Sequence, residues 1–211
     1  NVVTAFNENS LKDHAHQMFQ RVDKFWHPDI KLHAYHFDCA LDAYDLPSCI
    51  TYKNLEEVKE FNDFLSAMDV HNGTENGTIA YNWRVDALLT APKVFALTEK
   101  AFEIAEETKE GGWLVWLNTN IIPVANLTPD FIESFFPEGA DIVHLSGETV
   151  ENVADQYSNP CLMAFNLNNQ PPLDILGDLR GAYVSGEVLS YREWHDAFIF
   201  ERLLNIYRAH G

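Results

Sequence analysis

A five-residue apolar run, Trp113 to Leu117, limits the possible folds of this chain more than any other feature. It has no polar face, which is typical of a central parallel strand with helices packed on both sides. The polar tripeptide Asn118-Thr119-Asn120 follows directly. Ligands of open α/β sheets bind beyond the carboxyl ends of such strands. The run therefore predicts an α/β fold with a ligand site next to these polar residues.

Hydrophobic patterns elsewhere predict alternating strands and helices. Val2 to Phe6 is a β-prone run, and Ser10 is a candidate cap for an amphipathic helix that Pro28 ends. Residues Ile30 to Phe37 alternate like a strand, which completes a βαβ unit. Further predicted elements are helices from about Asn54, from near Pro92 to Gly111-Gly112, near Pro129 to Phe135 and from about Glu193 to Ala209, with strands near Ile142–Leu145 and Leu162–Phe165.

The chain length favours one domain. The 211 residues correspond to about 1.4 domains at ~150 residues each, and no repeat or linker-like segment divides them. We expect residues 1–211 to form a single α/β domain with a mixed, largely parallel sheet flanked by helices. The missing initiator Met indicates a trimmed chain or the N-terminal part of a longer multidomain protein.

Charge and cysteine content exclude several classes of function. The chain has 14 Lys and Arg against 32 Asp and Glu, a formal net charge of -18, which repels nucleic acids and anionic lipid surfaces. No apolar run approaches the ~20 residues that cross a bilayer, so we expect no transmembrane segment. Three cysteines without a CxxC pair indicate neither a disulfide framework nor a zinc site, and a reducing, cytoplasmic location fits best.

Four segments carry a resemblance to a known family. They are Lys93–Leu97, Trp113–Leu117, Ala164–Leu167 and Glu193–Asp196. In this order they resemble nucleotide-sugar glycosyltransferases of the GT-A fold, and within these the capsid-glycosylating domains of large algal (chlorella) viruses. The resemblance implies hexosyl or deoxyhexosyl transfer from a nucleotide-sugar, with a UDP-sugar as the favoured donor, to a hydroxyl of a glycan or glycoprotein. For a viral enzyme the location would be the host cytoplasm.

The resemblance also implies a donor site at the carboxyl edge of the sheet. Residues leaving the first strand would contact base and ribose, Arg84 or Lys93 would face the phosphates, and Asp86 would accept hydrogen bonds from a hydroxyl. A surface ion pair between Arg84 and Asp86 is the structural alternative. The predicted donor-binding residues are Thr4, Ala5, Phe6, Asn7, His36, Arg84, Asp86, Lys93, Leu117, Asn118, Thr119 and Asn120.

The catalytic candidates Glu193, His195 and Asp196 precede or begin the last predicted helix. Asp196 would act as general base toward an acceptor hydroxyl in an inverting reaction, or position the donor sugar in a retaining one. Helix capping is the structural alternative for this segment. Trp194 and Asn166 are the predicted acceptor-side residues, since aromatic faces stack on sugar rings.

The metal motif departs from the family pattern. The two aspartates of the DxD motif are Asn118 and Asn120 here, and Mn²⁺ or Mg²⁺ prefers anionic oxygen ligands. Three alternatives follow. Both amides and His195 hold a divalent cation weakly together with the diphosphate, Lys93 or Arg84 neutralises the diphosphate without a metal, or the domain is catalytically weak.

Two rival functions come from other classes. A non-catalytic domain that binds nucleotide-sugar or glycan would explain the degenerate metal motif, and an ordinary polar turn would explain Asn118 to Asn120. A nucleotidyltransferase is disfavoured because Thr4 to Ser10 contains no Gly, Lys or Arg for a phosphate loop.

Overall fold

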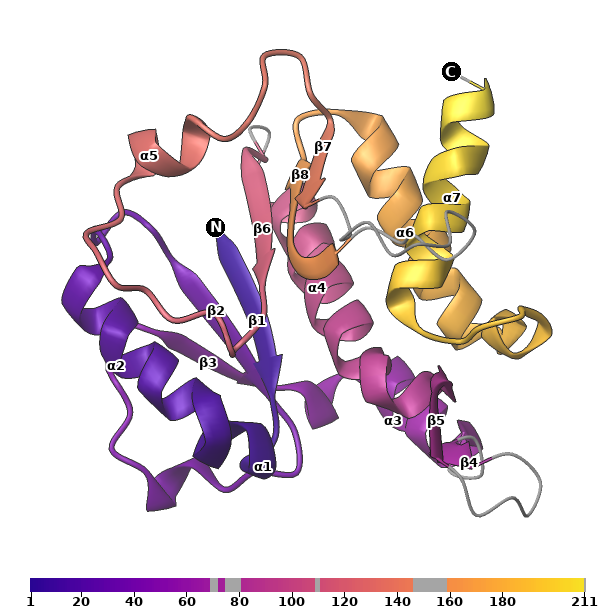
Figure 1. The fold of residues 1–211 in the computed structure, drawn as a ribbon, viewed down its shortest axis with the longest axis horizontal. Helices are drawn as coiled ribbons and strands as arrows, with labels where there is room; N and C mark the ends of the chain where they lie inside the picture. The colour runs from indigo at the N-terminus through magenta and orange to yellow at the C-terminus, as the bar shows by residue number, and fades with distance from the viewer. Residues whose placement is uncertain (69–71, 75–80, 109–110, 146–158, 211) are drawn as a thin grey trace.

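A six-stranded sheet organises the computed structural model, which describes residues 1–68, 72–74, 81–108, 111–145 and 159–210 (Figure 1). Its order is β3-β2-β1-β6-β8-β7. β8 alone among these six runs in the reverse direction, which confirms the predicted mixed, largely parallel sheet. The strands are β1 (Val2–Phe6), β2 (Leu32–His36), β3 (Thr51–Asn54), β6 (Trp113–Leu117), β7 (Ile142–Leu145) and β8 (Asn159–Asn166), with β4 (Asn72–Thr74) and β5 (Tyr81–Asp86) forming a separate pair.

Helices cover both faces of the sheet (Figure 1). One face packs against α2, and the other against α4, with α6 and α7 beyond it. None of the helices in the described ranges is both long and apolar enough to cross a membrane. The α-helices are α1 (Glu8–Ser10), α2 (His16–Phe25), α3 (Lys59–Met68), α4 (Ala87–Glu107), α5 (Pro129–Glu133), α6 (Gln170–Val184) and α7 (Asp196–His210), and a π-helical turn, Leu11–Ala15, joins α1 to α2.

The strand β6 is buried on both faces, as its apolar sequence predicts. Leu114 and Trp116 belong to the core cluster that includes α4, whereas Val115 and Leu117 belong to the cluster that includes α2. All four residues are at most 7% exposed. Because the strand is covered on both sides, its first accessible polar residues are those that follow Leu117.

The starts of four helices differ from the prediction, and the helix expected from about Asn54 is α3, which begins at Lys59. The first helical segment is capped by Asn7, which exchanges hydrogen bonds with Ser10 in a capping box, so Ser10 is not the cap. The helix α4 starts at Ala87 because Asp86 caps it, so Pro92 lies in its second turn. There the missing N–H cannot bond to the preceding turn. The helix α7 starts at Asp196, and Glu193 lies in the loop before it.

Three strands and one α-helix were not predicted from the sequence, and β4 is the shortest of them. The strands β3 and β5 are short; β3 is mostly half-buried and β5 is exposed over its first four residues, so they show little hydrophobic alternation. The helix α6 was also missed, although two prolines occupy its first turn and apolar residues recur along it. Its residues Ile175, Leu176 and Leu179 are buried against α4 and α7.

The packing around α4 gives a test of the fold. Phe95 is fully buried and packs against Phe61 and Phe64 of α3. We expect Phe95→Ala to lower the free energy of unfolding by about 3–5 kcal/mol, because it leaves a cavity. Phe135, which is 60% exposed, is the control, and Phe135→Ala should cost under ~0.5 kcal/mol. Urea unfolding measures both, and equal costs would contradict this packing.

Candidate active site

A pocket of about 400 Å³ lies at the carboxyl ends of β1 and β6. Segments that are distant in sequence form it: the end of β1 with the helical turns after it, Phe37 after β2, the first turns of α4, the end of β6 with the turn after it, Pro160 of β8 and the first residue of α7. This is the edge where α/β sheets bind ligands. The predicted site residues that line it are Ala5, Phe6, Asn7, Lys93, Asn118, Thr119, Asn120 and Asp196.

Lys93 and Asp196 form a buried ion pair in this pocket. Lys93 Nζ lies 2.7 Å from Asp196 Oδ2, and the two side chains are 12% and 8% exposed. Nζ also donates to the carbonyl oxygen of Pro160 at 2.7 Å and lies 5.2 Å from the ring centroid of Trp116. Burial lowers the pKa of Lys93, while the carboxylate of Asp196 opposes that change. The pair joins α4 to α7 and places both charges at the ligand edge.

Asn118 is held in place by its neighbours on β6 and β8. Its Oδ1 accepts a hydrogen bond from Trp116 Nε1 at 2.6 Å, and its Nδ2 donates to Cys161 Sγ at 3.4 Å. Its backbone N–H donates to the Cys161 carbonyl at 2.9 Å, and its own carbonyl closes a turn by accepting from Ile121 at 3.1 Å. Asn118 to Asn120 therefore form a polar turn that also lines the pocket.

A hydrogen-bond network fixes the loop before α7. His195 Nδ1 accepts from the backbone N–H of Phe198 at 3.3 Å, so the ring caps α7. His195 Nε2 then carries the proton and donates to Glu193 Oε2 at 2.8 Å. Arg84 and Arg192 also pair with the Glu193 carboxylate. Capping thus does occur here, through a histidine, and the network sets the direction in which Asp196 enters the pocket.

Tyr183 ties the same loop to α4. Its hydroxyl lies 2.9 Å from Thr90 Oγ1 and donates to the carbonyl of Trp194 at 3.2 Å. Burial raises the pKa of Tyr183 well above its ordinary value, so the hydroxyl keeps its proton. Because Thr90 lines the pocket, this bridge couples the pocket wall to the loop that carries Asp196.

Several predicted donor residues lie outside the pocket lining. Thr4 is fully buried within β1. Leu117 is buried in the core beneath the turn. Asp86 caps α4 and accepts a hydrogen bond from the Tyr81 hydroxyl, so it does not pair with Arg84. Arg84 instead pairs with Glu193 and lies over the Trp83 ring.

Two predicted residues line other hollows. His36 borders a hollow of about 740 Å³ beside β2 and β3. Asn166 borders one of about 590 Å³ at the amino ends of β1 and β6. Because β8 is antiparallel, its register pairs Asn166 with Trp113, the first residue of β6. This corrects the acceptor assignment of Asn166, which lies at the opposite end of the sheet from Asn118.

Trp194 also lies outside the pocket lining. Its backbone N–H donates to the Arg84 carbonyl at 2.7 Å, and its indole N–H donates to the Tyr191 carbonyl at 3.1 Å. The half-buried ring packs against the core. In this arrangement Trp194 holds the loop before α7 in place.

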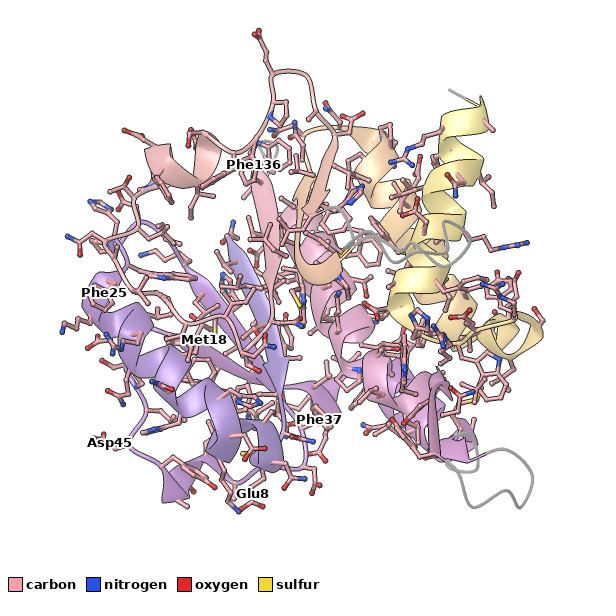
Figure 2. All side chains as sticks on the ribbon, in the orientation of Figure 1. Glu8, Met18, Phe25, Phe37, Asp45 and Phe136 are labelled. Carbon is pink, nitrogen blue, oxygen red and sulfur yellow. The ribbon has the colours of Figure 1, made fainter. Side chains whose placement is uncertain are left out.

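Two other parts of the site were not predicted from the sequence. His14 lines the pocket from the π-helical turn, and Phe37 lines it after β2. Phe37 lies beside the carboxyl end of β1 (Figure 2), where its backbone N–H donates to the Phe6 carbonyl at 3.2 Å. The π-helical turn breaks the α-helical spacing that sequence patterns reveal, and such turns are frequent at functional sites.

The pocket residues do not fit a divalent cation. The Asn118 amide oxygen is bonded to Trp116, and both ring nitrogens of His195 are engaged within its loop. Across the described ranges, no group of three His, Cys, Asp or Glu side chains is arranged to hold a metal ion. The ammonium of Lys93 borders the same pocket and would repel a dication.

Comparisons with known proteins concern the fold. No protein-family model matches the sequence, and a search of curated protein sequences finds no match. Among solved structures, mouse xyloside xylosyltransferase 1 in its apo form is similar, with a TM-score of 0.55 and 12% identity over 98% of this chain and 81% of that one. The bifunctional glycosyltransferase WbbM, also apo, has a TM-score of 0.52 and 11% identity over 96% of this chain and 36% of that one.

The chain has the GT-A fold. Identities of 11–12% show the fold alone, so activity has to be argued from the site. The GT-A sheet brings the predicted tripeptide Asn118-Thr119-Asn120 together with Lys93 and Asp196 at one edge. The predicted resemblance to viral capsid glycosyltransferases stays a prediction.

The buried ion pair makes a prediction about stability. Lys93→Met leaves the Asp196 carboxylate buried without its partner, and we expect it to cost about 3–5 kcal/mol of unfolding free energy. The double variant Lys93→Met/Asp196→Asn removes both charges and should cost clearly less. Lys59, whose exposed side chain pairs with Asp63, is the control, and Lys59→Met should cost under ~1 kcal/mol. Additive costs in urea unfolding would mean that the two charges do not interact.

Proposed function

We propose that this chain is a glycosyltransferase that moves a sugar from a UDP-sugar to a hydroxyl of a glycan or glycoprotein. The observation that carries the proposal is the joint placement of a cation, Lys93, and a carboxylate, Asp196, in the pocket at the carboxyl edge of a GT-A sheet. Transfer from a nucleotide-sugar needs both charges, because the leaving diphosphate is anionic and the acceptor hydroxyl loses a proton.

The donor would lie across the ends of β1 and β6. Its nucleoside would contact the turn Ala5 to Asn7 and the ring of Phe37, while its diphosphate would face Lys93 and the turn after β6. Phe6 is 1% exposed, whereas Phe37 is half-buried, so Phe37 is the better candidate for stacking on a base.

Asp196 would accept the proton of the acceptor hydroxyl. It is the one carboxylate among the described residues that line the pocket. The acceptor oxygen would bond to the anomeric carbon, and the bond from that carbon to the β-phosphate oxygen would break, with its electron pair remaining on the phosphate. Glu193 and His195 would act as positioning residues, since they hold the loop that aims Asp196.

The acceptor would bind on exposed apolar side chains next to the pocket. Tyr81, Trp83 and Leu89 are 57%, 44% and 57% exposed. Leu89 lines the pocket, and Trp83 packs against His195 with 4.8 Å between ring centroids. Aromatic faces of this kind stack on sugar rings. We propose this surface as the acceptor side in place of Asn166.

The proposal also includes a cytoplasmic location, which is consistent with the scarce cysteines, and a hexosyl or deoxyhexosyl donor, which is consistent with the family resemblance.

The rival function is a nucleotide-sugar or glycan-binding domain without turnover. It is supported by the asparagines at positions 118 and 120. Turnover distinguishes the two functions.

Calorimetric titration with UDP, UDP-glucose and GDP-mannose tests the donor site. We expect UDP to bind and GDP-mannose to bind at least about tenfold more weakly, which is ~1.4 kcal/mol. Slow release of UDP from UDP-glucose on addition of a glycan acceptor would support transfer. Binding without any release of UDP across a set of UDP-sugars would favour the non-catalytic rival, and no nucleotide binding would overturn the proposal.

Trp83 tests the acceptor side. We expect Trp83→Ala to raise the KM for a glycan acceptor by about tenfold, because loss of one stacked ring costs ~1 kcal/mol or more. The affinity for UDP should be unchanged, since Trp83 does not line the donor pocket. An unchanged acceptor KM with weakened UDP binding would assign the ring to the donor instead.

A further inference from the structure

We propose that the ammonium group of Lys93, held by Asp196 and Pro160, neutralises the donor diphosphate, and that donor binding and transfer need no divalent cation. The inference rests on the proposed nucleotide-sugar function and deepens it. It follows from a disagreement between the DxD metal motif that the family resemblance implies and the side chains that this chain places there.

Two of the metal ligands expected at this position, Asn118 and His195, have other partners. Asn118 and Asn120 bring no charge, and the Asn118 oxygen accepts a short hydrogen bond from Trp116. His195 is 2% exposed and uses one ring nitrogen to cap α7 and the other to bond Glu193. The one carboxylate among the described residues that line the pocket, Asp196, is paired with Lys93 at 2.7 Å. The neutral amide oxygens that remain are a weak site for Mn²⁺ or Mg²⁺.

The geometry favours Lys93 over Arg84 as the source of positive charge. Lys93 is the one lysine or arginine among the described residues that line the pocket. Arg84 is directed elsewhere, with Nε 3.4 Å from Glu193 Oε2 and its guanidinium 5.0 Å from the centroid of the Trp83 ring. Of the two cations considered from the sequence, the structure brings only Lys93 to the turn after β6.

Lys93 also retains the capacity to bind a phosphate oxygen. An ammonium has three N–H donors, and acceptors in the described part of the chain use two of them, one on Asp196 and one on Pro160. Both contacts are 2.7 Å long, so they fix the position of Nζ before any ligand arrives. These two bonds also set the direction of the third N–H bond of the ammonium. The Lys93 side chain therefore loses less conformational entropy when it binds an anion.

During the reaction, the negative charge that balances Lys93 would pass from Asp196 to the leaving diphosphate. When the bond between the anomeric carbon and the β-phosphate oxygen breaks, the electron pair stays on that oxygen and the diphosphate gains one negative charge. The acceptor oxygen bonds to the anomeric carbon, and its proton passes to Asp196. The neutral Asp196 then no longer balances Lys93, and the ammonium stabilises the leaving diphosphate instead. The total charge of the site is unchanged.

The first experiment compares UDP binding and sugar transfer by the wild-type chain in EDTA and in excess Mn²⁺, at matched ionic strength. We expect the dissociation constants and the turnover rates to agree within about threefold, a difference of ~0.65 kcal/mol. UDP binding that appears only with Mn²⁺ would overturn this inference and leave the proposed function standing. Absence of UDP binding in both buffers would overturn the proposed function, and this inference with it.

The second experiment isolates the lysine. Because Lys93→Met alone leaves a buried carboxylate, the informative comparison is Asp196→Asn against Lys93→Met/Asp196→Asn, which differ only at position 93. We expect Asp196→Asn to bind UDP at least as tightly as the wild type, since the diphosphate takes the place of the removed carboxylate. The double variant should bind UDP about 10- to 100-fold more weakly than Asp196→Asn, as expected for the loss of one charge-assisted hydrogen bond.

Uridine is the control ligand because it lacks phosphate. Its affinity should be the same for Asp196→Asn and for the double variant, which shows that both are folded and retain the nucleoside site. Equal UDP affinity of the two variants would overturn the inference. Parallel losses of uridine and UDP binding would also overturn it, since they would show a structural role of Lys93 rather than a contact with the diphosphate.

Discussion

The burial of β6 on both faces is the constraint on which the rest of this structure depends. Helices must cover both sides of the strand, so its first accessible polar groups are those of Asn118 to Asn120 at its carboxyl end. The parallel neighbour β1 ends at the same edge. The helix α4 that covers one face reaches this edge with its first turns, which carry Lys93. One buried strand thus determines where the candidate site lies.

The reversed direction of β8 completes the site, and it also explains why the prediction of Asn166 as an acceptor-side residue was wrong. Its first residues lie beside the end of β6, where Pro160 holds the Lys93 ammonium and Cys161 bonds to Asn118. Its last residue, Asn166, lies at the start of β6. Had β8 been parallel, Asn166 would have ended at the ligand edge. Strand direction depends on long-range pairing, and the local pattern of residues 162–165 does not reveal it.

The sequence was most informative for segments in which every residue is buried. It was least informative for contacts between particular side chains that are distant in sequence. The apolar run of β6 predicted both a central strand and its polar continuation, because full burial leaves a clear signature. The ion pair between Lys93 and Asp196 joins residues 103 positions apart, and no local pattern encodes such a contact. The same limit applies to His195, whose role as a cap depends on the position of Phe198 after folding.

The ion pair also shows how the proposed diphosphate site is compatible with a chain whose net charge is -18. Surface carboxylates more than ~8–10 Å away are screened by salt, whereas a buried charge is screened much less. Asp196 opposes the lowering of the Lys93 pKa by burial, and its carboxylate cancels the field of the ammonium at a distance. The pocket therefore does not attract anions in general. An anion gains from Lys93 only within hydrogen-bond distance, which requires the rest of the ligand to fit the pocket first.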